Sequence, residues 1–273
     1  MPRFAGCAGC RAWENTKVNT MRIEVILTPA ELPGLAKRDL SRTACVVFDI
    51  LRATSTFVTA LHNGAATVIP VGTIYEAFKI RKDRPEVLLG GERNGVKIKE
   101  EEGEFDLGNS PREYASTMVQ GKTIVSTTTN GTRALRACKD AQMVLAGAFL
   151  NLTATADCLL ENDFENVLLV CAGTGEKAAL EDILAAGALC EILEDDKAET
   201  ALSDSAQMAL AAYERVEGNL AEAIRQSENA RRLLAIPDLR DDVDFCLQRD
   251  IFNLVAALSE KRSGLNGLSA LDV

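Results

Sequence analysis

Residues 44–56, ACVVFDILRATST, decide the fold class of this chain. The first part of this stretch is apolar without a break, which is typical of a strand covered on both faces. Thr54 or Ser55 can cap a helix that continues to about Leu61 and ends at Asn63-Gly64. A buried strand that passes directly into a helix indicates an α/β protein.

The alternation of strand and helix continues along the chain on both sides of this stretch. We expect strands at 22–27, 67–71, 87–89, 123–126, 143–146 and 167–170, and helices at 74–82, 112–119, 132–138, 153–161 and 180–193. From about Ser203 the pattern is mainly helical until a last strand signal at 254–258. This order predicts a layered α/β/α protein with a largely parallel or mixed sheet and a helical C-terminal portion.

Composition limits the class of protein. No linker rich in Gly, Pro or Ser divides the chain, so we expect one α/β catalytic domain at 21–273 after an irregular extension at 1–20. No apolar run has the roughly 18 residues of a membrane helix, and the extension lacks the apolar core of a secretory signal. The net charge of -10 argues against nucleic-acid binding. It permits a small anionic substrate, because local cations can reverse the field in a cleft.

The cysteine pattern favours a reducing, cytoplasmic setting. Cys7 and Cys10 form one CxxC, and His62 is the only histidine, so a zinc site would lack ligands. The other six cysteines lie in apolar or helical patterns, as reduced core thiols do: Cys45, Cys138, Cys158, Cys171, Cys190 and Cys246. Because no GxSxG or strand-linked GxGxxG motif is present, acid–base chemistry falls to carboxylates, a metal-bound water, or both.

Polar residues gather where the predicted strands end, which is the edge at which α/β sheets bind ligands. Asp49 ends the buried strand, and a carboxylate there is costly unless a cation or Arg52 pairs with it. A simple helix cap is an equally weighted alternative. After the strand at 87–89, Glu92 can bind a metal and Arg93 can bind an oxyanion. For that segment alone, an ordinary turn with a solvated ion pair is favoured.

Two further turns lead from a strand into a helix. Residues 105–111, FDLGNSP, contain Asp106 and a helix start that suits an anion, although pure capping is the alternative. Residues 126–132, STTTNGT, offer hydroxyls and backbone amides to a phosphate without the spacing of a Walker loop. Plain β-propensity of the threonines is the alternative there. The candidate substrate-binding residues are Thr54, Ser110, Thr128, Thr129, Gly131 and Thr132.

A weaker candidate is the segment 170–176, VCAGTGE, which precedes a helix carrying Glu181 and Asp182. Cys171 is interpreted as a packed thiol, because a thiol phosphatase would need Arg where Lys177 stands. Glu181 and Asp182 can ligate a metal or match the positive end of the helix dipole.

Five segments, in order, resemble the 2-phosphosulfolactate phosphatase (ComB) family: VVFDILRATSTFVTAL, LLGGERNGVKI, FDLGNSP, TTTNGTRAL and CAGTGE followed by LED. The resemblance covers about 22–273. It implies a Mg²⁺-dependent phosphatase with its own α/β fold. It also implies hydrolysis of (2R)-2-phospho-3-sulfolactate to (2R)-3-sulfolactate and phosphate, an early step of coenzyme M biosynthesis where that coenzyme is made.

The resemblance leads to a mechanistic hypothesis. Arg52 and Arg93 would clamp the phosphate or sulfonate, and Asn130 would add neutral donors together with the neighbouring hydroxyls. The candidate Mg²⁺ ligands are Asp49, Glu92 and Asp106, with Glu181 and Asp182 in reserve. Asp49 can instead be a covalent nucleophile, as its place after a strand resembles haloacid-dehalogenase phosphatases, but their second Asp is replaced here by Leu51.

Two rival functions stay open. The first is a phosphatase of another 2-phospho-hydroxyacid on the same fold, and the second is a non-enzymatic anion-binding protein. As partners we expect a small phosphorylated anion and further copies of the chain in a homo-oligomer, and neither nucleic acid nor membrane.

Overall fold

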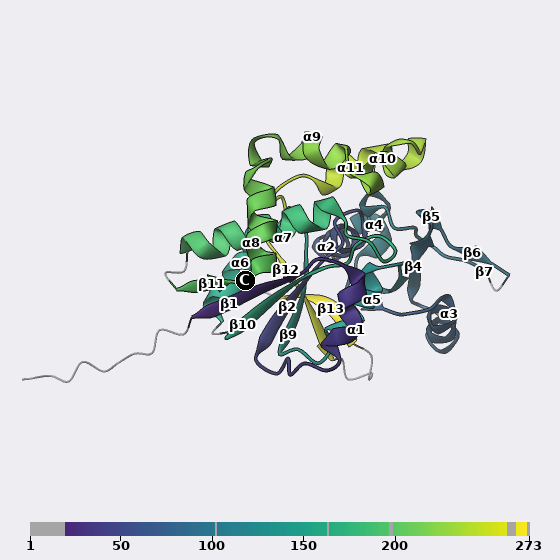
Figure 1. Ribbon diagram of the computed structural model, residues 1–273. Helices are drawn as coiled ribbons and strands as arrows, with labels where there is room; N and C mark the ends of the chain where they lie inside the picture. Colours follow the sequence, from purple (N-terminus) through teal and green to yellow (C-terminus); the bar gives the residue numbers. More distant parts are fainter. Residues whose placement is uncertain (1–19, 102, 163, 197–198, 261–265, 272–273) are drawn as a thin grey trace, which may run out of the picture.

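The computed structural model describes residues 20–101, 103–162, 164–196, 199–260 and 266–271 (Figure 1). The predicted extension, including Cys7 and Cys10, lies outside these residues apart from Thr20. Within the described ranges, no helix combines the length and the apolar character needed to cross a membrane.

The predicted α/β alternation is confirmed, with small shifts in the bounds of its elements. The strands are β1 (Met21–Ile26), β2 (Thr43–Phe48), β3 (Thr67–Pro70), β4 (Leu88–Arg93), β5 (Val96–Lys97), β6 (Lys99–Glu100), β7 (Gly103–Glu104), β8 (Thr123–Thr127), β9 (Met143–Gly147), β10 (Asn166–Cys171), β11 (Thr200–Leu202), β12 (Val255–Glu260) and β13 (Asn266–Leu271). The helices are α1 (Leu32–Leu35), α2 (Ala53–His62), α3 (Ile74–Asp83), α4 (Ser116–Val119), α5 (Gly131–Ala137), α6 (Leu152–Glu161), α7 (Leu180–Asp196), α8 (Asp204–Glu214), α9 (Leu220–Arg225), α10 (Glu228–Leu234) and α11 (Arg240–Cys246).

Two parts of the sequence-based assignment were incomplete. The helix expected at 112–119 is a 3-10 turn at Pro111–Glu113 followed by the single turn of α4. The sequence pattern also missed the short strands β5, β6, β7 and β11, and the longer strand β13. Short edge strands carry little alternation, so their apolar period is too brief to be recognised.

The large sheet consists of two groups of strands joined by the C-terminal hairpin. Its order is β11-β1-β10-β2-β9-β12-β13-β3-β8-β4-β5. The first strand group, β11 to β9, is parallel throughout. In the second strand group, β3, β8 and β4 are parallel, and β5 adds an antiparallel edge. The hairpin of β12 and β13 makes antiparallel pairs with β9 and β3, so the sheet is mixed.

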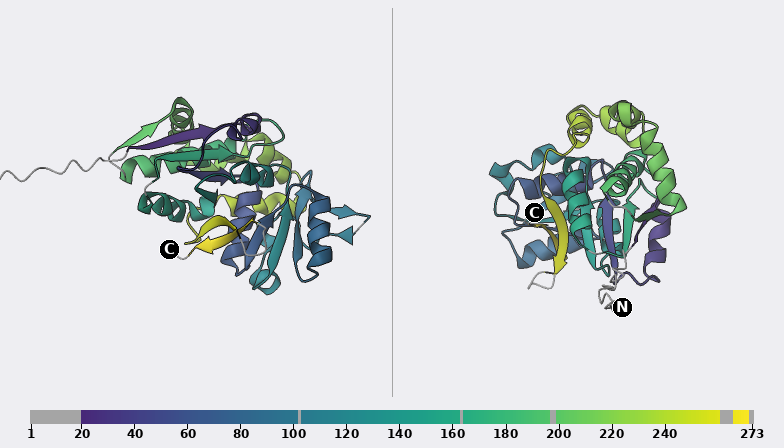
Figure 2. Two further views of the ribbon diagram at one scale, coloured as in Figure 1. Left: turned by 90° about the horizontal axis from the view of Figure 1, so that it is seen from below. Right: turned by 90° about the vertical axis from the view of Figure 1, so that its left-hand side faces the viewer.

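The twist of this sheet brings the two strand groups together at one site. Three antiparallel pairings separate β9 from β3, so in a flat sheet the carboxyl ends of the two groups would lie at opposite edges. Neighbouring strands, however, rotate by roughly 20–25° each, and five such steps separate β2 from β8. Figure 2 shows the two groups running in clearly different directions. As a result, Nδ2 of Asn130, after β8, donates to the carbonyl oxygen of Ala172, after β10, over 2.7 Å.

Helices α2 and α5 fill the space inside this bend. Helix α2 contacts β9 and β3 as well as the hairpin strands, and α5 contacts both β2 and β3. Every residue of α2 before His62 is therefore buried. Its hydroxyl groups are satisfied locally: Ser55 donates to the carbonyl of Ile50, and Thr59 to that of Ser55. This accounts for the many small polar residues in a helix without a solvent-facing side.

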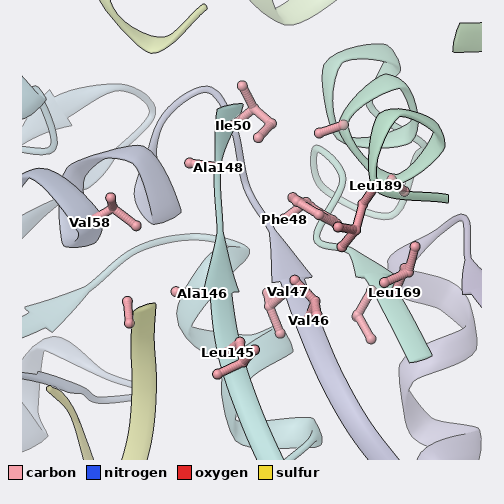
Figure 3. Packing of buried hydrophobic residues seen from close by; sticks show 14 of the residues in the cluster. Val46, Val47, Phe48, Ile50, Val58, Leu145, Ala146, Ala148, Leu169 and Leu189 are labelled. Atoms are coloured by element: carbon pink, nitrogen blue, oxygen red, sulfur yellow. The ribbon is translucent and has the colours of Figure 1, made fainter. Parts of the chain in front are cut away.

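The core is centred on β2, as its unbroken apolar run predicted. Val46, Val47 and Phe48 lie between Leu145 of β9 and Leu169 of β10 (Figure 3). All six residues of β2 are buried. The six cysteines assigned to the core are also buried and free, as expected.

The C-terminal helices are of two kinds: α8 covers the sheet beside α7, and α9, α10 and α11 lie beyond that cover (Figure 1). Helix α8 packs against α7 and β1, while α10 and α11 pack against each other (Figure 1). Helix α11 also contacts the 3-10 turn at Pro111–Glu113. Helices α10 and α11 thereby come close to the loops that follow the strands.

Candidate active site

A cavity of about 310 Å³ lies where loops from both strand groups meet helix α10. Its walls come from the β2–α2 loop, the β4–β5 turn, the β8–α5 turn and the segment between β10 and α7. The polar and charged residues that line it are Asp49, Arg52, Glu92, Asn94, Asn109, Thr129, Asn130, Thr174, Lys177, Glu181, Glu228, Asn229 and Arg232. This is the edge at which ligands bind to α/β sheets.

Asp49 lies at the bottom of this arrangement, between the N-termini of two helices. The backbone amides of Ala53 in α2 and Gly131 in α5 hydrogen-bond its carboxylate. A Cβ at Gly131 would lie 2.7 Å from Asp49 Oδ2, so only glycine permits this approach. Burial raises the pKa of Asp49 to about 7 despite the two amides, and the nearby charges of Glu92 and Glu181 act in the same direction.

Glu181 and Asp182 open helix α7 and have different surroundings. Asp182 accepts hydrogen bonds from the amides of Ile50 and Gly173, both over 2.9 Å, and so fixes the loops after β2 and β10. Its pKa is raised by burial and then by the charges of Asp49 and Glu181. Glu181 lines the cavity, and its buried Oε2 has no hydrogen-bond partner among the described residues.

Glu92 and Asn130 hold the loops of the second strand group. The Glu92 carboxylate accepts from the amide of Gly95 and from both the amide and the hydroxyl of Thr129. Asn130 donates to the carbonyls of Ala172 and Gly175, and its Oδ1 accepts from the Gly175 amide. These bonds lock the β8–α5 turn to both strand groups.

Arg52 is anchored from the C-terminal helices. Its Nη1 donates to Asp242 Oδ2 of α11 over 2.7 Å, and its Nη2 to the carbonyl of Gly95 over 3.0 Å. Both side chains of this ion pair are buried. Ser110 also donates to Asp242, over 2.7 Å. Arg52 therefore has a fixed position, and its charge is balanced inside the protein.

The structure brings together six of the residues that the sequence indicated. Asp49, Arg52, Glu92, Thr129, Asn130 and Glu181 line the cavity. Seven others lie around it without lining it: Thr54, Arg93, Ser110, Thr128, Gly131, Thr132 and Asp182. Arg93 donates to Thr127 and to the carbonyl of Glu92, and Thr54 accepts from the amide of Asp49. These residues shape the turns around the cavity.

Asp106 lies apart from the cavity. Its carboxylate forms an ion pair with Arg81 of α3 and accepts from the amide of Leu89 over 2.7 Å. The motif around it nevertheless contributes, because Asn109 lines the cavity and its buried Oδ1 has no partner among the described residues. Asn109 was not among the site residues that the sequence indicated.

Sequence reasoning missed the contribution of the C-terminal helices. Asn229 of α10 donates to the carbonyl of Leu51 over 2.7 Å and to Glu181 Oε1 over 2.9 Å. Arg232 of the same helix lines the cavity, and Asp242 of α11 anchors Arg52. These residues lie in charged helices where no motif marks one polar residue among many. The sequence had offered Asp49 as a partner for Arg52, whereas among the described residues Arg52 forms its ion pair with Asp242.

The lining suits a hard divalent cation that keeps part of its water shell. No group of three or more His, Cys, Asp or Glu side chains within the described chain converges as a closed metal site. Mg²⁺, however, typically uses one or two carboxylates, waters and substrate oxygens. The buried oxygens without partners at this cavity, Glu181 Oε2 and Asn109 Oδ1, are both acceptors. Asp49 and Glu181, with Asn109 as a neutral oxygen, therefore fit such an ion.

Buried carboxylates and cations around a cavity at the strand ends define the class of the protein as an α/β enzyme for a small anion. Residues 27–261 match the family described as 2-phosphosulpholactate phosphatase. A Thermotoga petrophila protein called probable 2-phosphosulfolactate phosphatase is 46% identical over 217 residues, covering 80% of this chain and 89% of the relative. One from Clostridium acetobutylicum with the same name is 35% identical over 236 residues, covering 86% and 96%. The chain belongs to the 2-phosphosulpholactate phosphatase family and is a phosphatase.

Proposed function

We propose that this phosphatase hydrolyses (2R)-2-phospho-3-sulfolactate to (2R)-3-sulfolactate and phosphate with the help of Mg²⁺. The observation that supports it is the pair of buried carboxylates, Asp49 and Glu181, that line one cavity, where Glu181 Oε2 has no hydrogen-bond partner within the described part of the chain. A carboxylate in this state needs a cation, and the substrate is itself an anion. Both needs would be met by a divalent cation that Asp49 and Glu181 hold, because it would neutralise the carboxylates and attract the anion.

The residues of the chain then have distinct roles. Asp49 and Glu181 would hold Mg²⁺ with Asn109, and the bound ion would supply charge neutralisation and polarisation of the phosphoryl group. Arg52, fixed and neutralised by Asp242, would contribute its remaining N–H donors to the phosphate from the cavity wall. Thr129 and Asn130 hold the turn that contacts the same group. Positioning and electrostatics of this kind account for most of the stabilisation of a phosphoryl transition state.

Asp49 can take one of two roles at this site, and the choice determines the reaction course. As a nucleophile it would form an aspartyl phosphate, while as a ligand it would leave attack to water. Acid quenching during turnover separates these routes, because it traps an aspartyl phosphate. A trapped phosphate on Asp49 supports the nucleophile, whereas steady turnover without any trapped adduct supports the ligand.

The direct test is phosphate release from a panel of 2-phospho-hydroxyacids. We expect the highest kcat/KM with 2-phospho-3-sulfolactate in Mg²⁺ and loss of activity in EDTA that Mg²⁺ restores. Faster hydrolysis of an unsulfonated 2-phospho-hydroxyacid would favour the rival substrate class. Binding of these compounds without any turnover would indicate an anion-binding protein.

We also propose a reducing, cytoplasmic setting and a homo-oligomer. The free, buried thiols support the first. The second rests only on the general frequency of symmetric oligomers among enzymes. A part in coenzyme M biosynthesis depends on whether the organism makes that coenzyme.

A further inference from the structure

The cations that line the cavity differ in whether they are already paired. Arg52 is neutralised by the buried carboxylate of Asp242. Lys177 Nζ lies 3.7 Å from Glu228 Oε1 in an exposed pair at the rim. The third cation is Arg232, and none of the acidic side chains in the described ranges forms an ion pair with it. Its guanidinium is therefore available to an anionic ligand.

The position of Arg232 is set by a buried amide. Arg232 Nη2 donates to Asn229 Oδ1 over 2.9 Å. The Nδ2 group of Asn229 donates to Glu181 Oε1 over 2.9 Å and to the carbonyl of Leu51 over 2.7 Å. Both N–H groups and the oxygen of the Asn229 amide therefore form hydrogen bonds. The amide cannot rotate without breaking several of these bonds. One side chain thus links the carboxylate side of the cavity to the guanidinium of Arg232.

We infer that Arg232 binds the sulfonate of the substrate and determines the preference for a sulfonated phosphoester. The inference rests on the proposed function. In the substrate, the phosphate ester and the carboxylate are both attached directly to C2, while the sulfonate is one carbon further away. With the phosphate beside Asp49 and Glu181, the sulfonate would reach Arg232, which lines the same cavity and hydrogen-bonds the Asn229 side chain that also contacts Glu181. A guanidinium binds such an oxyanion through parallel N–H donors.

The chain offers a matched control next to this residue. Arg231 belongs to the same helix, is exposed like Arg232 and does not line the cavity. Replacing either residue removes one positive charge from α10. A difference between Arg231→Ala and Arg232→Ala therefore reports position in the cavity and not net charge.

The test compares the kinetics of the full chain with 2-phospho-3-sulfolactate and with 2-phospholactate, which lacks the sulfonate. For Arg232→Ala we expect kcat/KM to fall roughly 10- to 100-fold with the sulfonated substrate, mainly through KM, because a charge-assisted hydrogen bond is lost. With 2-phospholactate the fall in kcat/KM should be clearly smaller, because that substrate has no sulfonate to lose and only the hydrogen bond from Arg232 to Asn229 is removed. Arg231→Ala should retain the wild-type preference, and Arg232→Lys should restore part of it.

Two kinetic outcomes would overturn the inference. One is equal behaviour of the two alanine variants, and the other is an equal loss with both substrates in Arg232→Ala. If the wild-type chain hydrolyses neither compound, the proposed function fails, but Arg232 can still be assessed by calorimetry. We expect 3-sulfolactate with Mg²⁺ to bind more weakly to Arg232→Ala than to Arg231→Ala, and equal affinities would refute a sulfonate contact.

Discussion

The two sides of the cavity differ in how their residues reach it. The strand-end side consists of Asp49, Glu92, Asn130 and Glu181, which stand within a few residues of a strand end or a helix start. The helical side consists of Asn229, Arg232 and Asp242, from α10 and α11 far along the chain. The strand-end side supplies the buried carboxylates that line the cavity. On the helical side, Asn229 hydrogen-bonds Glu181 and Asp242 balances the charge of Arg52. Local strand-to-helix geometry thus places one set of residues at the cavity, and long-range packing of the C-terminal helices places the other.

The largest expected effect belongs to the strand-end side. Replacing Asp49 by Asn keeps its shape but removes the buried charge beside the amides of Ala53 and Gly131. We expect at least a roughly 10²–10³-fold loss of kcat, because such a group acts on the charge of the transition state. Phosphate release, with circular dichroism to verify folding, measures it. Wild-type turnover in this variant would remove Asp49 from the mechanism.

The helical side should show its largest effect in stability. In Asp242→Asn, the Arg52 guanidinium stays buried without its carboxylate, which costs about 3–5 kcal/mol of unfolding free energy. The matched variant is Asp241→Asn, since that neighbouring carboxylate is 70% exposed and pairs with Arg112 at the surface. It should cost at most about 1 kcal/mol. Urea unfolding measures the stability of both variants. Similar losses of unfolding free energy would mean that the buried Arg52–Asp242 pair stabilises the fold no more than the exposed pair does.

The raised pKa of Asp49 predicts how stability depends on pH in the metal-free chain. Between about pH 4 and 7 the folded protein keeps a proton that the unfolded chain has released. Unfolding free energy should therefore fall as pH rises through this window, by at most ~1.4 kcal/mol per pH unit from this group. In Asp49→Asn the fall should be less steep, although Asp182 acts in the same direction. Urea unfolding at several pH values in EDTA measures this dependence. If unfolding free energy changes with pH equally in the wild-type chain and in Asp49→Asn, the pKa of Asp49 is not raised.

A smaller effect should link the two sides of the cavity. Asn229→Ala removes the donor to Glu181 Oε1, so we expect Mg²⁺ affinity to fall roughly 10- to 100-fold. Asn63→Ala is the control, because Asn63 also donates to a backbone carbonyl, that of Tyr114, but does not line the cavity. Calorimetry with Mg²⁺ distinguishes them. Unchanged affinity in Asn229→Ala would show that Glu181 does not hold the ion.

The smallest effect is expected at Asp106, which the sequence placed among the metal ligands. Asp106→Asn loses the ion pair with Arg81 but can still accept from the amide of Leu89. We expect at most about 1 kcal/mol of destabilisation and no change in the Mg²⁺ concentration needed for activity. A large rise in the Mg²⁺ concentration needed for activity would show that Asp106 contributes to metal binding.

The sequence by itself determined the alternation of strands and helices and the strand-end side of the cavity. An unbroken apolar run such as that of β2 and a turn such as TTTNG are local signals, because burial and turn geometry act over a few residues. Asp49 and Asn130 could be selected for this reason. The motif around Asp106 was also recognisable, but the sequence could not show which of its polar side chains faces the cavity.

Only the tertiary structure decided how these parts meet. Because the C-terminal hairpin lies between β9 and β3, twist carries the second strand group back onto the first, and no local pattern encodes that placement. The same folding brings Asp242 to Arg52 and Asn229 to Glu181, pairs separated by 190 and 48 residues. Buried charges need partners, but any acidic residue in the helices could have met that need. Packing in three dimensions selects the one that does.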